Sequence, residues 1–286
     1  MSKLVFSILV MCFTLQVNSA PHQQVTEINK ETATFYHISQ QDIEFSGKSY
    51  RLFIAAPKII VQPLSVLYLL DGNAHFPLAL NSVKTDRTLP LIVGIGYPDS
   101  CAYSIVRRTK DYTPPAIGLE FQQGGEAEGF LQFIRSQVKP TIEAKYAIDH
   151  AHQYFFGHSF GGLFGLYILF NQPELFQYYT IASPSLWWGD GVIIPRHKPW
   201  INHSPHAIWV TLGEYEERPE EDPQMTNERL NKIKRRQRIL STRKLADELA
   251  QQGQPVTFEL LPRANHGAAI LPAIQQTLGR MQHSQP

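Results

Sequence analysis

The sequence predicts an α/β fold in which a central, mostly parallel sheet of about eight strands is flanked by helices. Short apolar runs in the chain are continuous rather than alternating, which is typical of strands covered on both faces. Helical patterns separate most of these runs, and such alternation favours parallel strands joined by helices. The chain has neither an internal repeat nor a low-complexity tract, which fits a single domain.

The expected strands follow the apolar runs in order. The first two runs, residues 34–38 (TFYHI) and 50–55 (YRLFIA), look like a leading antiparallel pair. The other strands are expected at residues 65–70, 91–97, 153–156, 178–183, 207–213 and 256–261.

Apolar residues at helical spacing predict the helices. These are expected at residues 129–146, 163–170, 227–252 and 268–282. In the long stretch 227–252, one apolar stripe indicates a single helix whose basic side chains form its wet face. A second interpretation gives these basic residues an anionic ligand or surface.

Composition limits the classes of function. The chain has 286 residues, 43% of them hydrophobic and 18% charged, which is ordinary for a globular protein with a sizeable core. Its net charge of +1 gives no indication of a nucleic-acid partner or an anionic membrane. No HExxH motif, cysteine pair, calcium-loop pattern or glycine-rich phosphate loop occurs, so we expect neither a metal nor a cofactor.

The N-terminus has the three parts of a secretory signal. Lys3 is followed by an apolar run over residues 4–15 and by small and polar residues over 16–20. The apolar run is too short to span a bilayer. We therefore expect residues 1–19 to be a signal peptide, residues 20–286 to form a single domain, and the product to be periplasmic or secreted. A retained membrane anchor is the alternative. Cys101 is then the single cysteine left, so we expect no internal disulfide.

A candidate nucleophile lies in the segment YFFGHSFGG. Gly157-His158-Ser159-Phe160-Gly161 matches G-x-S-x-G between an expected strand and an expected helix, which is the context that a nucleophile elbow requires. The turn is so sharp that we expect both motif glycines to be needed for close backbone approach. Ser159 is then an exposed, strained nucleophile; a plain turn is the alternative.

A serine hydroxyl needs a base, usually histidine. His266 follows the last expected strand, where hydrolases with this elbow place the base. The acid should follow the preceding strand, and there the chain reads Glu214-Tyr215-Glu216-Glu217. We favour Glu216 and then Glu214. In the alternative, this acidic loop is solvated and a Ser–His pair works alone.

Two backbone N–H groups are expected to stabilise the oxyanion. One belongs to Phe160, directly after the nucleophile. The other follows the strand at 65–70, where Gly72 allows a close turn and Asn73 is the candidate donor.

The segments YLLDGN, GIGYP, DYTPP, GHSFGG, SPSLWW and NHG occur in this order. Together they resemble an esterase branch of the α/β-hydrolase superfamily that includes esterase D, feruloyl esterases and mycolyl transferases. The chain is most similar to the enterochelin and salmochelin type of siderophore trilactone esterase, from about residue 30 to about residue 280. Residue by residue, the resemblance implies Ser159 as nucleophile, His266 as base and Glu216 as acid, with Asn73 and Phe160 as oxyanion donors.

Aromatic and basic side chains follow two of the expected strands at the edge where such sheets bind ligands. The candidates for substrate binding are Trp187, Trp188, Arg107, Arg108, Tyr112 and His75. Basic groups beside aromatic rings suit an anionic aromatic ligand such as a ferric catecholate. Equally, the tryptophans fit a core, and the basic residues fit a solvated loop.

The sequence thus predicts an exported serine esterase whose substrate is a small-molecule ester. The resemblance implies a ferric catecholate siderophore of the enterobactin type. General short-acyl, feruloyl or thioester hydrolysis, acyl transfer to an alcohol, and a non-catalytic binding protein are the alternatives. The oligomeric state is not indicated.

Overall fold

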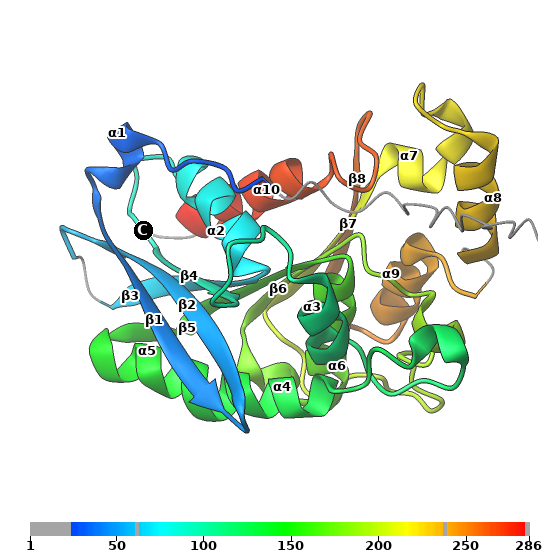
Figure 1. Ribbon diagram of the computed structural model, residues 1–286, viewed down its shortest axis with the longest axis horizontal. Helices are drawn as coiled ribbons and strands as arrows, with labels where there is room; N and C mark the ends of the chain where they lie inside the picture. Colours follow the sequence, from blue (N-terminus) through cyan, green and yellow to red (C-terminus); the bar gives the residue numbers. More distant parts are fainter. Residues whose placement is uncertain (1–23, 61–62, 237–238, 284–286) are drawn as a thin grey trace, which may run out of the picture.

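An eight-stranded sheet runs through the whole molecule (Figure 1). The computed structural model describes residues 24–60, 63–236 and 239–283. The predicted signal peptide lies outside these residues. Strands occur at β1 (Tyr36–Phe45), β2 (Lys48–Pro57), β3 (Leu64–Leu70), β4 (Leu91–Gly96), β5 (Ile148–His158), β6 (Tyr178–Ala182), β7 (Ala207–Gly213) and β8 (Val256–Leu261).

The leading pair is an antiparallel hairpin at the edge of the sheet. β1 and β2 pair from Tyr36 with Pro57 to Phe45 with Lys48. Ser46 and Gly47 make the connection with φ values of 49° and 72°, the left-handed conformation that tight hairpins require. The hairpin is longer than predicted because the second half of the edge strand β1 alternates exposed polar residues with half-buried Ile43 and Phe45, so it carries no continuous apolar run.

The remaining strands form the parallel part of the sheet, in the order β4-β3-β5-β6-β7-β8. β2 joins this part antiparallel to β4. Every residue of β3 and of β4 is buried, which is why these strands read as continuous apolar runs. The chain moves from β3 to β4 on one side and then to β5 on the other side of β3. The carboxyl ends of β3 and β5 therefore flank a topological switch point, where open α/β sheets bind their ligands.

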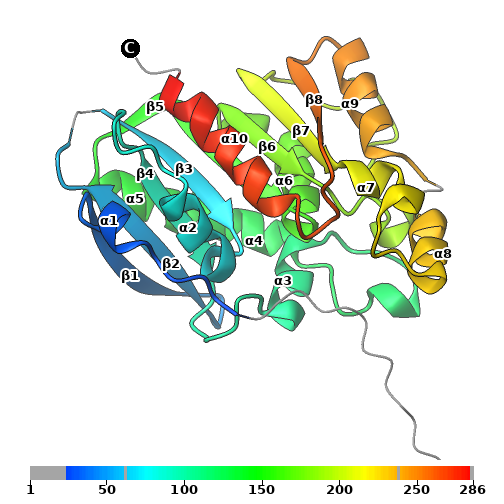
Figure 2. The same ribbon diagram turned by 90° about the horizontal axis from the view of Figure 1, so that it is seen from above.

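Helices cover both faces of the sheet (Figures 1 and 2). α2 (Gly72–Asn81) and α10 (Ile270–His283) lie together on one face, with α1 (Lys30–Ala33) beside α2. The other face carries α3 (Ile105–Tyr112), α4 (Ala127–Phe133), α5 (Lys139–Lys145) and α6 (Phe160–Asn171). A π-helical turn over Ile134–Val138 joins α4 to α5. The predicted fold class and the helices expected at 129–146, 163–170 and 268–282 are confirmed.

Two predictions about local structure are wrong. The stretch 227–252 contains two helices, α8 (Asn227–Arg236) and α9 (Thr242–Gln251), instead of one. Ser241 starts α9 by accepting a hydrogen bond from Lys244 N at its hydroxyl, so the apolar stripe does not continue through it. The segment around Arg107, expected to be a loop, is helix α3. Among the described residues, no helix is long and apolar enough to cross a membrane.

Candidate active site

A sharp elbow joins β5 to α6. Ser159 lies between them with φ 59° and ψ −117°, a conformation that residues with a side chain rarely adopt. Its N–H donates to Ala182 O at 3.0 Å, and its carbonyl accepts from Ser185 N at 3.1 Å. Backbone of the neighbouring strand and of the loop after it therefore holds the strained turn and presents the hydroxyl at the end of the sheet.

The two motif glycines are not equally constrained. A Cβ added to Gly157 would lie 2.1 Å from Gly161 O, whereas one added to Gly161 would lie 3.5 Å from Leu70 Cβ, an ordinary contact. Gly162 is the other tight position, because its added Cβ would lie 2.8 Å from Ala182 O. The prediction that both motif glycines are needed for close approach is therefore wrong for Gly161.

Hydrogen bonds connect three of the predicted site residues. His266 Nε2 lies 3.0 Å from Ser159 Oγ, and His266 Nδ1 lies 2.6 Å from Glu216 Oε2. Because a carboxylate oxygen only accepts, Nδ1 carries the hydrogen and Nε2 is left to accept the serine proton. In this arrangement a base can activate a serine hydroxyl.

The carboxylate of Glu216 is fixed by further donors. Glu216 lies in α7 (Glu214–Glu217), and its Oε1 accepts from Ser183 Oγ at 2.6 Å and from Gly213 N at 3.0 Å. Burial by itself raises the pKa of Glu216, but His266, Ser183 and Gly213 together lower that pKa below its ordinary value. The group is therefore ionised at neutral pH and able to stabilise a protonated His266.

The other predicted acid, Glu214, has a different partner. Its Oε2 accepts from Arg263 N at 2.7 Å, in the turn that leads to His266. Arg263 has φ 53°, so this bond supports a strained position. Of the two glutamates, Glu216 contacts His266, and Glu214 contacts the loop that carries His266.

The two predicted oxyanion donors begin neighbouring helices. Phe160 is the first residue of α6 and Asn73 the second of α2, so neither N–H has an acceptor within its own helix. The strands before these helices, β3 and β5, are adjacent in the sheet. Gly72 lets α2 begin directly against β4, because a Cβ there would lie 2.7 Å from Gly94 C. Binding of an oxyanion by these two N–H groups stays a prediction.

A buried ion pair holds Asp71, the residue directly before α2. Arg108 donates two hydrogen bonds of 2.8 Å to the carboxylate of Asp71, and both side chains are buried. Asp71 N–H donates to Tyr112 Oη at 3.1 Å. Because Asp71 has φ 53°, these bonds stabilise a strained residue close to Asn73. Sequence reasoning missed the pair, since no spacing rule connects an aspartate with an arginine 37 residues later.

Burial divides the six residues predicted to bind substrate. Four are buried, namely His75, Arg108, Tyr112 and Trp188. Their contacts are with the protein: Trp188 Nε1, for example, donates to Pro114 O at 2.9 Å. Trp187 and Arg107 are partly exposed, and the Trp187 ring lies 5.8 Å from the Phe160 ring. Burial argues against direct substrate contact by the four buried residues, and substrate binding stays a prediction for Trp187 and Arg107. The Arg107 side chain itself donates to Ser49 O and lies 4.3 Å from the centre of the Tyr97 ring.

Two serines of the segment SPSLWW were not predicted as site residues. Ser183 Oγ donates to Glu216, and Ser185 Oγ lies 3.2 Å from Ser159 Oγ. The segment SPSLWW is one of those that carry the resemblance. It could have indicated its serines as well as its tryptophans, but only the tryptophans were predicted. His158, directly before Ser159, was not predicted as a site residue either, and it packs against His266 with ring centroids 4.6 Å apart.

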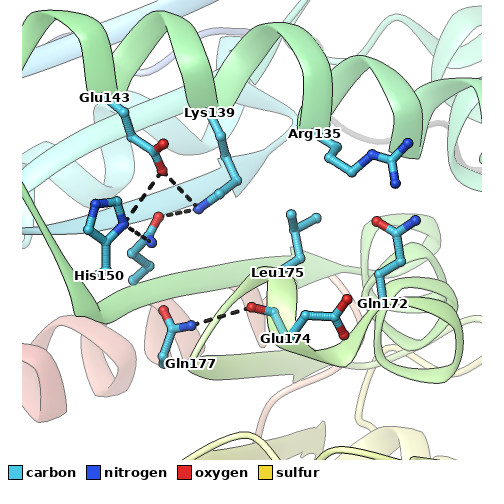
Figure 3. A pocket seen from close by; sticks show the side chains of 9 residues that line it. Arg135, Lys139, Glu143, His150, Gln172, Glu174, Leu175 and Gln177 are labelled. Atoms are coloured by element: carbon cyan, nitrogen blue, oxygen red, sulfur yellow. Dashed lines mark hydrogen bonds and ion pairs between the residues drawn. The ribbon is translucent and has the colours of Figure 1, made fainter.

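A polar hollow with a volume of about 430 Å³ lies elsewhere, between α5, β5 and residues 172–177 (Figure 3). Glu143, Lys139 and His150 point toward one another in it, with Lys139 Nζ 3.3 Å from Glu143 Oε1. None of its lining residues is a predicted site residue, so we do not assign the active site to it. In the described ranges, no three His, Cys, Asp or Glu side chains gather as a metal site.

The sheet, the elbow after β5 and the histidine after β8 define the chain as an α/β-hydrolase. A family model with the description "Putative esterase" matches residues 47–266, and the chain belongs to this family. It is a carboxylic ester hydrolase. The resemblance drawn from the sequence segments is thereby confirmed.

Individual relatives agree with the family. The chain is 34% identical over 195 residues to the ferri-bacillibactin esterase BesA of Bacillus subtilis, covering 60% of this chain and 67% of the relative. It is 31% identical over 243 residues to a siderophore enterobactin esterase of Emericella nidulans, covering 73% and 79%. The solved structure of siderophore hydrolase EstA from Aspergillus nidulans is similar with a TM-score of 0.77 at 24% identity, over 93% of this chain and all of that chain, which supports the fold.

Proposed function

We propose that this chain is an exported serine hydrolase that cleaves siderophore esters through an acyl-enzyme on Ser159. The observation that carries the chemistry is the hydrogen-bonded series from Ser159 Oγ through His266 to Glu216. The observation that supports the substrate class is the set of relatives, whose names refer to ferri-bacillibactin, triacetylfusarinine C, enterobactin and apo-salmochelin. The apolar run at residues 4–15 supports export.

The proposed reaction has two halves. His266 Nε2 takes the proton of Ser159 Oγ as this oxygen attacks the ester carbonyl, and the N–H groups of Phe160 and Asn73 stabilise the oxyanion. His266 then gives the proton to the leaving alkoxide, and an acyl-enzyme remains. A water molecule, deprotonated by His266, attacks the acyl carbonyl, and the proton returns to Ser159 as the acid leaves. Glu216 stabilises the protonated His266 in both halves.

Among siderophores we favour a ferric catecholate trilactone of the enterobactin type. Trp187 is partly exposed and its ring packs next to Phe160, so a catechol bound close to the proposed oxyanion donor would meet an aromatic ring. Arg107, in α3, supplies a positive charge that suits an anionic ferric complex. A hydrolase for simple short-acyl esters would not need either group.

The test uses the chain from Ala20 onward, with Ser159→Ala as the control variant. Ferric enterobactin and p-nitrophenyl butyrate are supplied in parallel, and the products are identified by mass spectrometry. We expect the trilactone to be opened much faster than the butyrate is cleaved, and the alanine variant to be inactive on both. Butyrate hydrolysis with an intact trilactone would remove the siderophore substrate, and turnover by the alanine variant would remove the serine mechanism.

A further inference from the structure

The three residues of the hydrogen-bonded series come from three separate elements. The loop between β8 and α10 must therefore hold His266 in register with both Glu216 and Ser159. Besides the bond from His266 Nδ1 to Glu216, two bonds join this loop to α7, the helix of the proposed acid: Arg263 N donates to Glu214 Oε2 at 2.7 Å, and Tyr215 N donates to Ala264 O at 3.0 Å. These bonds fix the loop relative to the acid but not relative to the strand that carries the nucleophile.

His158 supplies a bond on the nucleophile side. Its Nε2 lies 2.9 Å from the main-chain oxygen of His266. Because a carbonyl only accepts, Nε2 carries the hydrogen and donates it. His158 is the last residue of β5 and directly precedes Ser159. This single bond therefore joins the main chain of the base to the elbow.

The surroundings keep His158 in the neutral form that this bond uses. The residue is 4% exposed. Burial lowers the pKa of His158, and the neighbouring His266, His75 and Arg108 lower it further, since each carries or can carry a positive charge. No second positive charge then forms beside His266 when that residue accepts the serine proton. The charge of Arg108 is paired with that of Asp71.

A second histidine supports the ring of His158. The His75 ring lies edge-on to it, with centroids 6.3 Å apart. His75 Nδ1 lies 3.0 Å from Leu70 O, to which it donates, and Nε2 lies 3.2 Å from Tyr103 Oη, from which it accepts. His75 is thus fixed in turn and lies against one side of the His158 ring.

We propose that His158 is a positioning residue that sets the distance between His266 Nε2 and Ser159 Oγ by holding the His266 main chain. The inference rests on the proposed function of Ser159 and His266, and it gives a role to the second residue of the G-x-S-x-G motif. Displacing a reacting group by about 1 Å can cost on the order of 10²-fold in rate. Such a loss acts on the chemical step, so it should appear in kcat and not in KM.

The test compares two replacements of similar size. His158→Leu removes the donor, whereas His158→Gln keeps an N–H at nearly the same reach. We expect the leucine variant to lose about 10²-fold in kcat with KM within about twofold, and the glutamine variant to keep at least about a third of kcat. His152→Gln, on the distant part of β5, is the matched control and should leave both constants unchanged. Thermal unfolding of each variant shows that the protein measured is folded.

A third variant keeps the proposal testable if the leucine protein does not fold. His158→Asn retains an amide that is one bond too short to reach the carbonyl, so it should lose kcat as the leucine variant does. Equal kcat for the asparagine and glutamine variants, or an unchanged kcat in the leucine variant, would overturn the positioning role. Ser159→Ala, measured in parallel, separates the two claims: turnover in that variant would refute the proposed function itself, whereas its inactivity beside a fully active leucine variant refutes only the role of His158.

Discussion

The proposed nucleophile and the proposed base are held in different ways. Ser159 lies in a strand-to-helix junction where backbone of β6 and the loop after it fixes an unusual φ. The side chain of His266 is 43% exposed, on a loop held by residues from α7 and β5. The first position can be recognised from the residues next to it in the sequence, although backbone of β6 and of the loop after it also holds it. The second depends on contacts with residues 50 and 108 positions away. The difference shows that a short motif can define a nucleophile, whereas the fold defines its base.

The largest effect expected from this comparison concerns the acid. Glu216→Gln keeps the size of the side chain but removes the charge that fixes the His266 tautomer and stabilises its protonated form. We expect kcat to fall by about 10³- to 10⁴-fold, by analogy with the loss of the aspartate charge in serine proteases. Steady-state kinetics on the preferred ester measures this.

Glu214→Gln is the matched control for the acid, since it removes the same charge two residues away. Because the Glu214 carboxylate contacts the loop before His266 and Arg218 but not His266 itself, we expect a loss within about tenfold. Equal losses in the two variants would contradict the assignment of Glu216. Full activity of Glu216→Gln would show that Ser159 and His266 work as a pair.

A smaller effect is expected at the elbow. In Gly157→Ala the new Cβ would meet Gly161 O, so the turn must open. We expect a loss of about 10²-fold in kcat and about 1–3 kcal/mol in the free energy of unfolding. Gly161→Ala places its Cβ at ordinary contact distance and should be much milder in both measurements. Equal losses in the two variants would show that the close approach of Gly157 to Gly161 O does not limit this turn.

The parallel part of the fold was predictable because its strands are buried on both faces. The second half of β1 was not, since its polar residues are held by pairing with β2 and not by burial. The break between α8 and α9 depends on the cap at Ser241, which is a local signal hidden within a longer apolar stripe. Hydrophobic periodicity therefore describes the centre of this sheet well and its periphery poorly.

The candidate site was likewise predictable only in part. Order along the chain and position after a strand were enough to select Ser159, His266 and Glu216, because strand ends meet at one edge of the sheet. The side chains that hold these residues, such as His158, Ser183 and Arg108, could not be selected. Their partners are distant in sequence, and a buried histidine or arginine reads like a surface residue until the fold is known.

The smallest expected effect is a change of stability with pH. The pKa of Glu216 lies below its ordinary value of 4.5 in the folded protein, so its ionised form stabilises the fold. This contribution is fully present above the unfolded-state pKa and is lost as the pH falls through the lower, folded-state pKa. Relative to the melting temperature of Glu216→Gln, that of the wild type should therefore fall as the pH drops below about 4.5. A difference that is constant from pH 7 to pH 3 would contradict the assigned pKa shift.

The central claim is that His266 activates Ser159. The most direct test is labelling with a fluorophosphonate, followed by peptide mass spectrometry, in the wild type and in His266→Gln. We predict a label on Ser159 alone in the wild type, and labelling slower by at least about 10³-fold in the variant, because the serine then has no base. A label on another residue, or equal rates in the two proteins, would contradict the account.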